Sequence, residues 1–95
     1  MYAISVENKV KRWKKRLPQN IQEIFNDEVR KIAKNPYEGE RKTGDLKEVF
    51  VWKFKIFTLQ YLIAYKIVEQ EKTIIILAIG PHENFYRDLK KFLFG

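Results

Sequence analysis

The sequence contains no cysteine and a single histidine. A disulfide framework and a thiolate metal site are therefore excluded, and one histidine argues against a zinc site. No apolar run reaches the ~18 residues that a membrane span needs, and the first residues lack the apolar core of a signal peptide. We therefore expect a cytoplasmic protein with no membrane contact, no metal and no small-molecule cofactor.

Acidic residues are also few, since 12 Asp and Glu stand against 19 Lys and Arg, which gives a net charge of +7. Residues 1–20 hold six of the basic side chains and one acidic side chain, Glu7. Such an excess favours a nucleic-acid partner first and an acidic protein partner second, with a merely well-solvated surface as the alternative. The 45% hydrophobic and 15% aromatic content excludes a disordered chain, and 95 residues predict one domain over residues 1–95.

The first third of the chain predicts a strand followed by two helices. Residues 2–6 alternate weakly, as a strand does. Apolar residues then recur at helical spacing among lysines, at Val6, Val10, Trp13 and Leu17. Pro18 ends this basic amphipathic helix, and residues 21–33 keep a helical period until Asn35-Pro36. We expect the two helices to form an antiparallel hairpin.

The rest of the chain predicts a sheet and a short helix. Residues 36–48 mix Pro, Gly and charge without period and indicate an exposed loop. The period then changes to two and predicts a meander of three strands at residues 50–56, 59–68 and 73–79, the last almost wholly apolar and therefore central. Gly80-Pro81 is expected to break the sheet and start a C-terminal helix with a buried stripe at Phe85, Leu89, Phe92 and Leu93. The order β-α-α-β-β-β-α describes an α+β fold whose sheet rests one face on the helical hairpin.

The strand at residues 50–56 is predicted to have two faces of different character. One face, which we interpret as core, carries Phe50, Trp52, Phe54 and Ile56. The other face carries Lys53 and Lys55, about 7 Å apart by strand rise. Phosphates along a nucleic-acid backbone have a similar spacing, so the two lysines suit an RNA backbone. The alternative is a solvated face whose lysines discourage edge-to-edge aggregation.

The single histidine, His82, belongs to a dense group of reactive side chains near the C-terminus. If the last helix begins at Pro81, then His82, Tyr86 and Lys90 share one stripe of it. If Asn84 is instead the N-cap, His82 precedes the helix and its direction is open. A purely structural histidine is the alternative to a functional one.

A polyanion-binding face beside a titratable group suggests cleavage of RNA by attack of the 2′-hydroxyl on its own phosphate. This reaction needs a base for the hydroxyl, positive charge around the phosphorus and an acid for the leaving 5′-oxygen. Histidine, tyrosine, lysine and arginine supply all three roles without a metal.

Three stretches resemble the RelE/ParE superfamily of toxins from bacterial type II toxin–antitoxin systems. They are GDLKEVFVWKFK, LIAYKI and the ending IIILAIGPHENFYRDLKKF, and the ending is similar to the GxHENFYRDLK motif of one RelE-like branch. The resemblance covers nearly the whole chain and implies a strand, a helical hairpin, a meander sheet and a C-terminal segment. It also implies a ribosome-dependent endoribonuclease that cleaves mRNA, inhibits translation and is silenced by a cognate antitoxin.

The active sites of this superfamily draw on strand lysines or arginines and on a histidine, tyrosine or arginine near the C-terminus. The resemblance therefore implies proton transfer by His82 or Tyr86, with neither favoured over the other. It assigns stabilisation of the phosphate to Lys53, Lys55 and Arg87.

One position departs from the pattern of the superfamily. Many RelE-like toxins carry an arginine on the second meander strand, as in YRVIY, where this sequence reads YLIAY with Leu62 in its place. The charge is then expected from another cation, for which Lys66, Arg41 and Lys42 are the candidates. These three and Lys90 complete the predicted RNA-binding surface.

Two other functions fit parts of the pattern. A ParE-like inhibitor of DNA gyrase is a protein-binding toxin that needs no proton shuttle, so a histidine beside strand lysines favours the nuclease. A non-catalytic RNA-binding module of the same fold would stack bases on exposed aromatic side chains. The aromatic residues Phe50, Trp52 and Phe54 are instead predicted to face the core.

Overall fold

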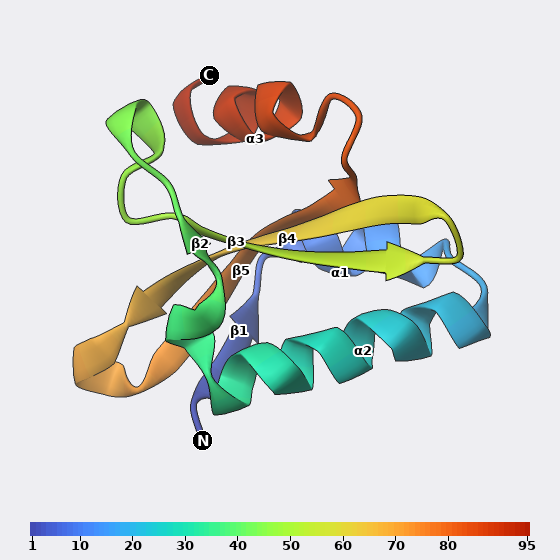
Figure 1. The fold of residues 1–95 in the computed structure, drawn as a ribbon, viewed down its shortest axis with the longest axis horizontal. Coiled ribbons are helices and arrows are strands. Elements are labelled where there is room, and N and C mark those ends of the chain that lie inside the picture. Colours follow the sequence, from blue (N-terminus) through green and yellow to red (C-terminus); the bar gives the residue numbers. More distant parts are fainter.

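A five-stranded mixed sheet lies between two layers of helix (Figure 1). The computed structural model describes all residues, 1–95. The strands are β1 (Ala3–Val6), β2 (Glu40–Arg41), β3 (Phe50–Ile56), β4 (Leu59–Val68) and β5 (Thr73–Pro81), and the helices are α1 (Asn8–Lys15), α2 (Gln19–Lys34) and α3 (Phe85–Phe94). The sheet order is β1-β5-β4-β3-β2, in which β1 is parallel to β5 and the other neighbours are antiparallel. The predicted α+β fold is confirmed, and none of its helices has the length and apolarity needed to cross a membrane.

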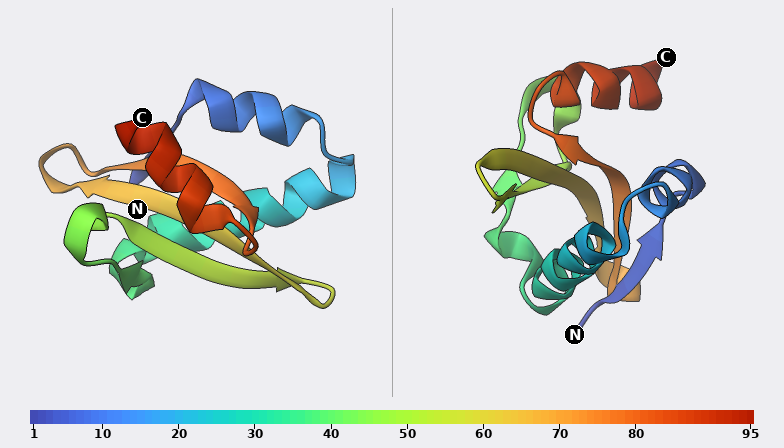
Figure 2. Two further views of the ribbon diagram at one scale, coloured as in Figure 1. Left: turned by 90° about the horizontal axis from the view of Figure 1, so that it is seen from above. Right: turned by 90° about the vertical axis from the view of Figure 1, so that its right-hand side faces the viewer.

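The helices α1 and α2 form the predicted hairpin and cover one face of the sheet (Figure 2). The apolar stripe of α2 is buried there, with Phe25 at 1% and Ile32 at 0% exposure. The Phe25 ring meets Trp13 of α1 and Phe54 of β3 edge-on, at centroid distances of 5.9 and 5.3 Å. Burial of each such side chain contributes about 1.5–3 kcal/mol. This layer therefore holds the hairpin on the face of β3 that the sequence predicted to be core.

The helix α3 lies on the opposite face of the sheet, which the sequence left unassigned (Figure 2). Its Phe85 and Leu89 side chains join Leu62 of β4 and Val51 of β3 in a second buried cluster, and each of the four is at most 5% exposed. Because helices cover both faces, β5 is apolar on both sides, as predicted for a central strand. The cover is partial, since Lys53 on the same face stays exposed.

Residues 36–48 are more ordered than the exposed loop that the sequence predicted. Two short 3-10 turns, η1 (Pro36–Glu38) and η2 (Gly44–Leu46), flank the two-residue strand β2. This strand pairs antiparallel with β3, with Glu40 opposite Val51. The segment therefore forms one edge of the sheet and lies beside β3.

The prediction that Gly80-Pro81 breaks the sheet is wrong. Pro81 is the last residue of β5 and lies opposite Tyr61. The neighbouring ladder bond runs from the His82 N–H to the Gln60 carbonyl at 2.9 Å. Bonded and non-bonded pairs alternate in antiparallel strands, so the missing N–H of Pro81 falls where β4 requires no donor. Of the two helix starts left open, the structure has the later one, with α3 beginning after Asn84.

Candidate active site

Lysines of β3 and the single histidine share one face of the sheet. Lys53 and Lys55 are exposed on the α3 side of β3, as their alternation predicted. Lys55 lies opposite Gln60 of β4, and Gln60 in turn accepts the backbone N–H of His82. Neighbouring strands lie about 5 Å apart, so the Lys55 and His82 backbones are roughly 10 Å apart in one row across the sheet. This separation leaves room for a phosphodiester between their side chains.

Tyr86 is the second residue of α3 and lies beside His82. Their rings meet edge-on at a centroid distance of 6.3 Å. The Lys42 ammonium lies 4.7 Å from the Tyr86 ring centroid on the side of β2. The Tyr86 hydroxyl is buried and makes no hydrogen bond. The structure therefore brings together Lys42, Lys53, His82 and Tyr86, although the phenol of Tyr86 is covered in this arrangement.

Glu40 connects the two lysines at this site and was missed by the sequence analysis. One of its carboxylate oxygens lies 2.7 Å from the Lys42 ammonium and the other lies 3.0 Å from the Lys53 ammonium. Hydrogen bonds from Lys42 and then Lys53 lower the pKa of Glu40 to about 2. The same carboxylate raises the pKa of Lys42. Lys42 is therefore a cation at neutral pH and suits charge stabilisation better than proton abstraction.

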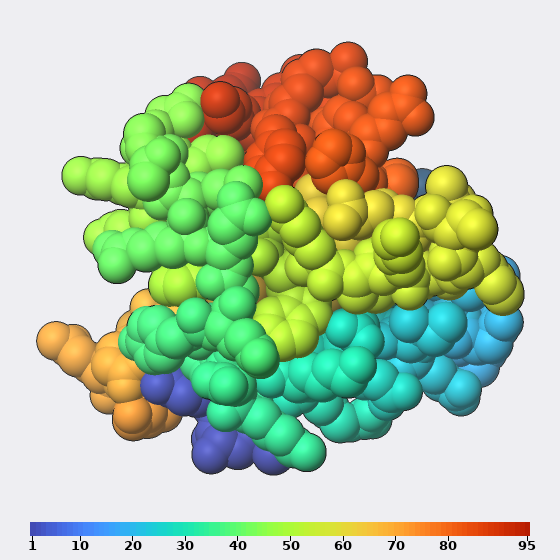
Figure 3. All heavy atoms as spheres, in the orientation of Figure 1, coloured from blue at the N-terminus to red at the C-terminus, as the bar shows by residue number.

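Four of the predicted residues lie apart from this group or at its border. Arg41 follows Glu40 on β2 and lies opposite Phe50 of β3. Arg41 and Lys66 line a separate hollow of about 560 Å³. Arg87 is exposed, and its guanidinium lies 3.4 Å from the carboxylate of its neighbour Asp88. Lys90 lies 3.4 Å from Asp45 of η2, so it borders the site. Figure 3 shows the segment around β2 and β3 meeting the start of α3 on one face of the molecule.

Leu62 occupies the position where many RelE-like toxins carry arginine. It lies on β4 between Lys53 of β3 and Gly80 of β5, and it is 0% exposed. Phe85 and Leu89 of α3 belong to the same buried cluster. A leucine here packs against α3, and the positive charge in this region comes from Lys53, which lies opposite Leu62 on β3, and from Lys42, which follows β2 and lies over the Tyr86 ring.

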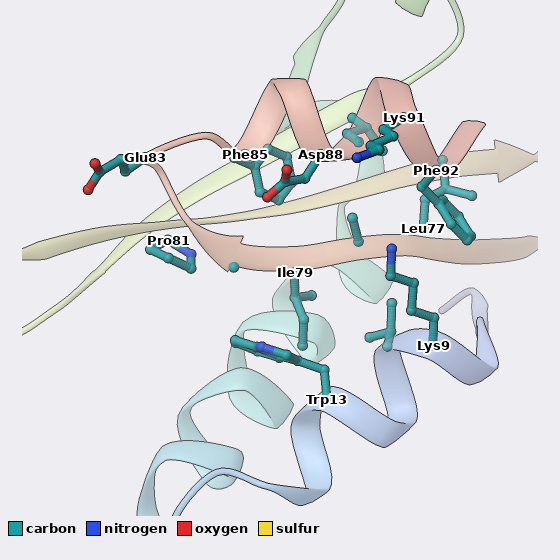
Figure 4. A pocket seen from close by; sticks show the side chains of 14 residues that line it. Lys9, Trp13, Leu77, Ile79, Pro81, Glu83, Phe85, Asp88, Lys91 and Phe92 are labelled. Atoms are coloured by element: carbon teal, nitrogen blue, oxygen red, sulfur yellow. The ribbon is translucent and has the colours of Figure 1, made fainter. Parts of the chain in front are cut away.

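An apolar hollow lies on the other flank of α3 (Figure 4). It has a volume of about 470 Å³ and is enclosed by α1, β5 and α3, with Trp13, Ile79 and Phe92 among its lining side chains. His82 and Tyr86 are not part of the lining, so this hollow is separate from the candidate site. No group of three or more His, Cys, Asp or Glu side chains is arranged so that it could hold a metal ion.

Comparison with known proteins gives a family and a fold. A family model described as a ParE-like toxin of type II bacterial toxin–antitoxin systems matches residues 4–90. No curated protein matches the chain in sequence. Among solved structures, a chain of the intact E. coli RelBE toxin–antitoxin complex is 13% identical with a TM-score of 0.70, covering 87% of this chain and 99% of its own.

Two further solved structures are similar to this chain. A chain of the toxin–antitoxin complex RelBE2 from Mycobacterium tuberculosis is 18% identical with a TM-score of 0.74, covering 85% of this chain and 98% of its own. A mutant of the E. coli toxin RelE in the free state is 14% identical with a TM-score of 0.72, covering 95% of each chain. At such identities, the likeness to these structures concerns the fold.

Proposed function

The chain belongs to the family of ParE-like toxins of type II bacterial toxin–antitoxin systems, and from this premise we propose that it is a metal-independent endoribonuclease. The observation that carries the proposal is that Lys55, Gln60 and His82 lie in one row across the sheet. Lys53 lies two residues before Lys55 on the same face of β3. A base or acid thus lies next to two cations on an exposed surface. Cleavage of RNA by the neighbouring 2′-hydroxyl needs both a proton-transfer group and positive charge at the phosphate.

In the proposed reaction, His82 accepts the proton of the attacking 2′-hydroxyl, the lysines stabilise the charge on the phosphate, and the leaving 5′-oxygen takes a proton from solvent at this exposed surface. His82 is exposed, whereas the Tyr86 hydroxyl is buried and unpaired. The imidazole therefore meets substrate without a rearrangement, and the Tyr86 ring contributes by supporting it edge-on. We assign Lys53 and Lys55 to the stabilisation of the charge that develops on the phosphate oxygens. Arg87 is free enough to reach the RNA backbone beside them, since its side chain is 72% exposed.

Lys42 supplies the positive charge that Leu62 lacks in this proposal. Of the three substitutes that the sequence offered, Lys42 is the one that lies at Tyr86 and shares a carboxylate with Lys53. Arg41 and Lys66 line the separate hollow at the β2 edge. We therefore assign Lys42 to the site and Lys90 to its border, and we place Arg41 and Lys66 in contacts with RNA farther away.

The proposed partners are a cognate antitoxin, the ribosome and mRNA. The RelBE structures that share this fold contain toxin–antitoxin complexes, which supports an antitoxin as the inhibitor. We expect the antitoxin either to cover the lysines of β3 or to displace α3. The net charge of +7 suits a ribosomal RNA surface, so cleavage is proposed to depend on the ribosome and to take place in the cytoplasm.

Mapping of mRNA 5′ ends after induction of the protein in bacteria tests the proposal. New ends are expected with the wild type, and His82→Ala is expected to reduce them at least about 100-fold, the usual contribution of a positioned acid or base. Lys53→Ala should also reduce them, whereas Lys34→Ala on α2 is the matched control and should not. Purified protein should cut mRNA on ribosomes and leave free RNA largely intact. Unchanged cleavage in His82→Ala would contradict the assignment.

Inhibition of DNA gyrase is the second candidate, favoured by the ParE-like description of the family model. It predicts DNA breaks after induction without new mRNA ends, and the toxicity would then survive His82→Ala. The third candidate, an RNA-binding module without catalysis, is less well supported. Phe50 is 8% exposed and Trp52 and Phe54 pack against the core, so these rings are unavailable for stacking on bases.

A further inference from the structure

Glu40 holds two lysines of the candidate site with one carboxylate. Its two oxygens are divided between the ammonium groups of Lys42 and Lys53, at 2.7 and 3.0 Å. Lys42 is 20% exposed, and its ammonium also lies over the Tyr86 ring. Lys53 is 41% exposed and projects from the middle of β3. A cation of β3 and a cation just after β2 thus converge on a single anion at the surface.

A phosphodiester presents the same pattern as this carboxylate, because it also carries one negative charge on two neighbouring oxygens. We propose that Glu40 is an internal competitor for phosphate: its carboxylate occupies the Lys42–Lys53 pair in the free protein, and an RNA phosphodiester must displace it to bind there. The inference rests on the proposed RNA substrate, and it adds a residue that limits which RNA the site accepts.

The position of Glu40 allows the exchange that this role requires. It lies on β2, a strand of two residues at the edge of the sheet, and its side chain is 50% exposed. Its carboxylate can therefore swing into solvent without disturbing the core. Exposed ion pairs are individually weak and are screened by salt, so a phosphate supported by further contacts can replace them.

The consequence is selectivity against loosely bound polyanions. For a ligand that binds only when the carboxylate is displaced, the apparent affinity equals the intrinsic affinity multiplied by the fraction of sites that are free. RNA that touches the two lysines alone then competes poorly with Glu40. RNA that is also held elsewhere on this face, as by Lys55, overcomes the competition. The carboxylate thereby favours substrate that is presented in one defined position.

A purely structural ion pair predicts the opposite result, which makes the inference testable. If Glu40 only positions the lysines, its removal weakens RNA binding. If it competes with phosphate, its removal strengthens binding. The matched control is Glu38→Gln. Glu38 lies two residues before Glu40 and forms no ion pair in the structure, so this substitution removes the same charge without breaking a contact to a lysine.

The experiment measures binding of a fluorescent 2′-O-methyl oligoribonucleotide, which cannot be cleaved, by fluorescence anisotropy at fixed salt. Glu40→Gln is expected to bind about three- to tenfold more tightly than the wild type, as the loss of two weak ion pairs implies. Glu38→Gln should differ from the wild type by less than about twofold, since it changes only the long-range charge. Adding Lys53→Ala to Glu40→Gln should remove the gain.

Two outcomes overturn the inference. Equal affinities of Glu40→Gln and Glu38→Gln, or weaker binding by Glu40→Gln, would show that the carboxylate does not compete with phosphate. Absence of binding by the wild type and every variant at low salt would refute the RNA surface itself, and the inference with it. A gain in Glu40→Gln without any mRNA cleavage in cells would instead refute only the nuclease, so the two failures are distinguishable.

Discussion

Replacement of Leu89 by alanine tests whether α3 is held on the sheet by the second buried cluster. Leu89 is 1% exposed and lies in that cluster with Leu62 and Phe85. Truncation of a buried leucine to alanine costs about 2–5 kcal/mol, depending on how far the cavity collapses. A helix of ten residues is marginal by itself in water, so this loss is expected to fall on the docking of α3 rather than on the whole fold.

Hydrogen exchange of the backbone amides measures the loss where it occurs. A cost of about 2–5 kcal/mol raises the local opening constant of α3 roughly 30- to 5,000-fold. The amides of β3 and β4 also belong to the sheet core against α1 and α2, so their protection should change much less. Phe94→Ala is the matched control on the same helix, because Phe94 is 63% exposed. Its cost should stay within about 0.5 kcal/mol.

The same variant connects the packing of α3 to function. His82 and Tyr86 flank the start of α3, so its undocking should separate them from Lys42 and reduce toxicity in cells. Unchanged exchange of α3 in Leu89→Ala would show that the helix is not held by this cluster. Equal acceleration in Leu89→Ala and Phe94→Ala would refute the reasoning from burial as well.

Three further predictions concern the opposite end and face of the molecule. Gly39→Ala should lower the melting temperature, since its methyl group would lie 2.1 Å from the Tyr65 hydroxyl oxygen; adding Tyr65→Phe should give a loss smaller than the sum of the two separate losses, and a fully additive loss would contradict the clash. Hydrogen bonds from Lys72, Tyr37 and Tyr2 lower the pKa of Glu69 to about 2, so its contribution to stability is present above about pH 4.5 and is lost as the pH falls toward 2; urea titrations of Glu69→Gln should lack this part of the acid dependence, and an unchanged dependence would refute it. Trp52→Phe removes the indole hydrogen bond to Glu28 at 2.9 Å and should cost about 1 kcal/mol in chemical denaturation, with no measurable cost counting against that bond.

The main elements of the fold could be predicted because the sequence gives each of them a clear period. Phe50, Trp52 and Phe54 alternate onto the face that the structure buries under α2. The residues of β5 are apolar on both faces, and β5 does lie inside the sheet, between β1 and β4. In both strands, burial follows directly from the side-chain pattern, so the pattern was sufficient.

The edge strand and its carboxylate could not be predicted in the same way. β2 consists of Glu40 and Arg41, two charged residues without a hydrophobic period, and only its pairing with β3 makes it a strand. Sequence spacing therefore gave no sign that Glu40 lies between Lys42 and Lys53. The prediction that Pro81 breaks the sheet failed for a related reason. A proline ends a strand only where the neighbouring strand needs its backbone N–H as a hydrogen-bond donor, and the sequence does not show which positions these are.

The place of β5 in the sheet has a consequence for how the chain folds during its synthesis. β5 is the last strand in sequence, yet it pairs with both β1 and β4, and it is the only partner of β1. About seventy residues separate Ala3 from its partner Thr73, and such distant pairings slow folding. The sheet is incomplete until residues 73–81 have left the ribosome. Because His82 and Tyr86 follow directly after β5, the candidate site forms only after the sheet is complete.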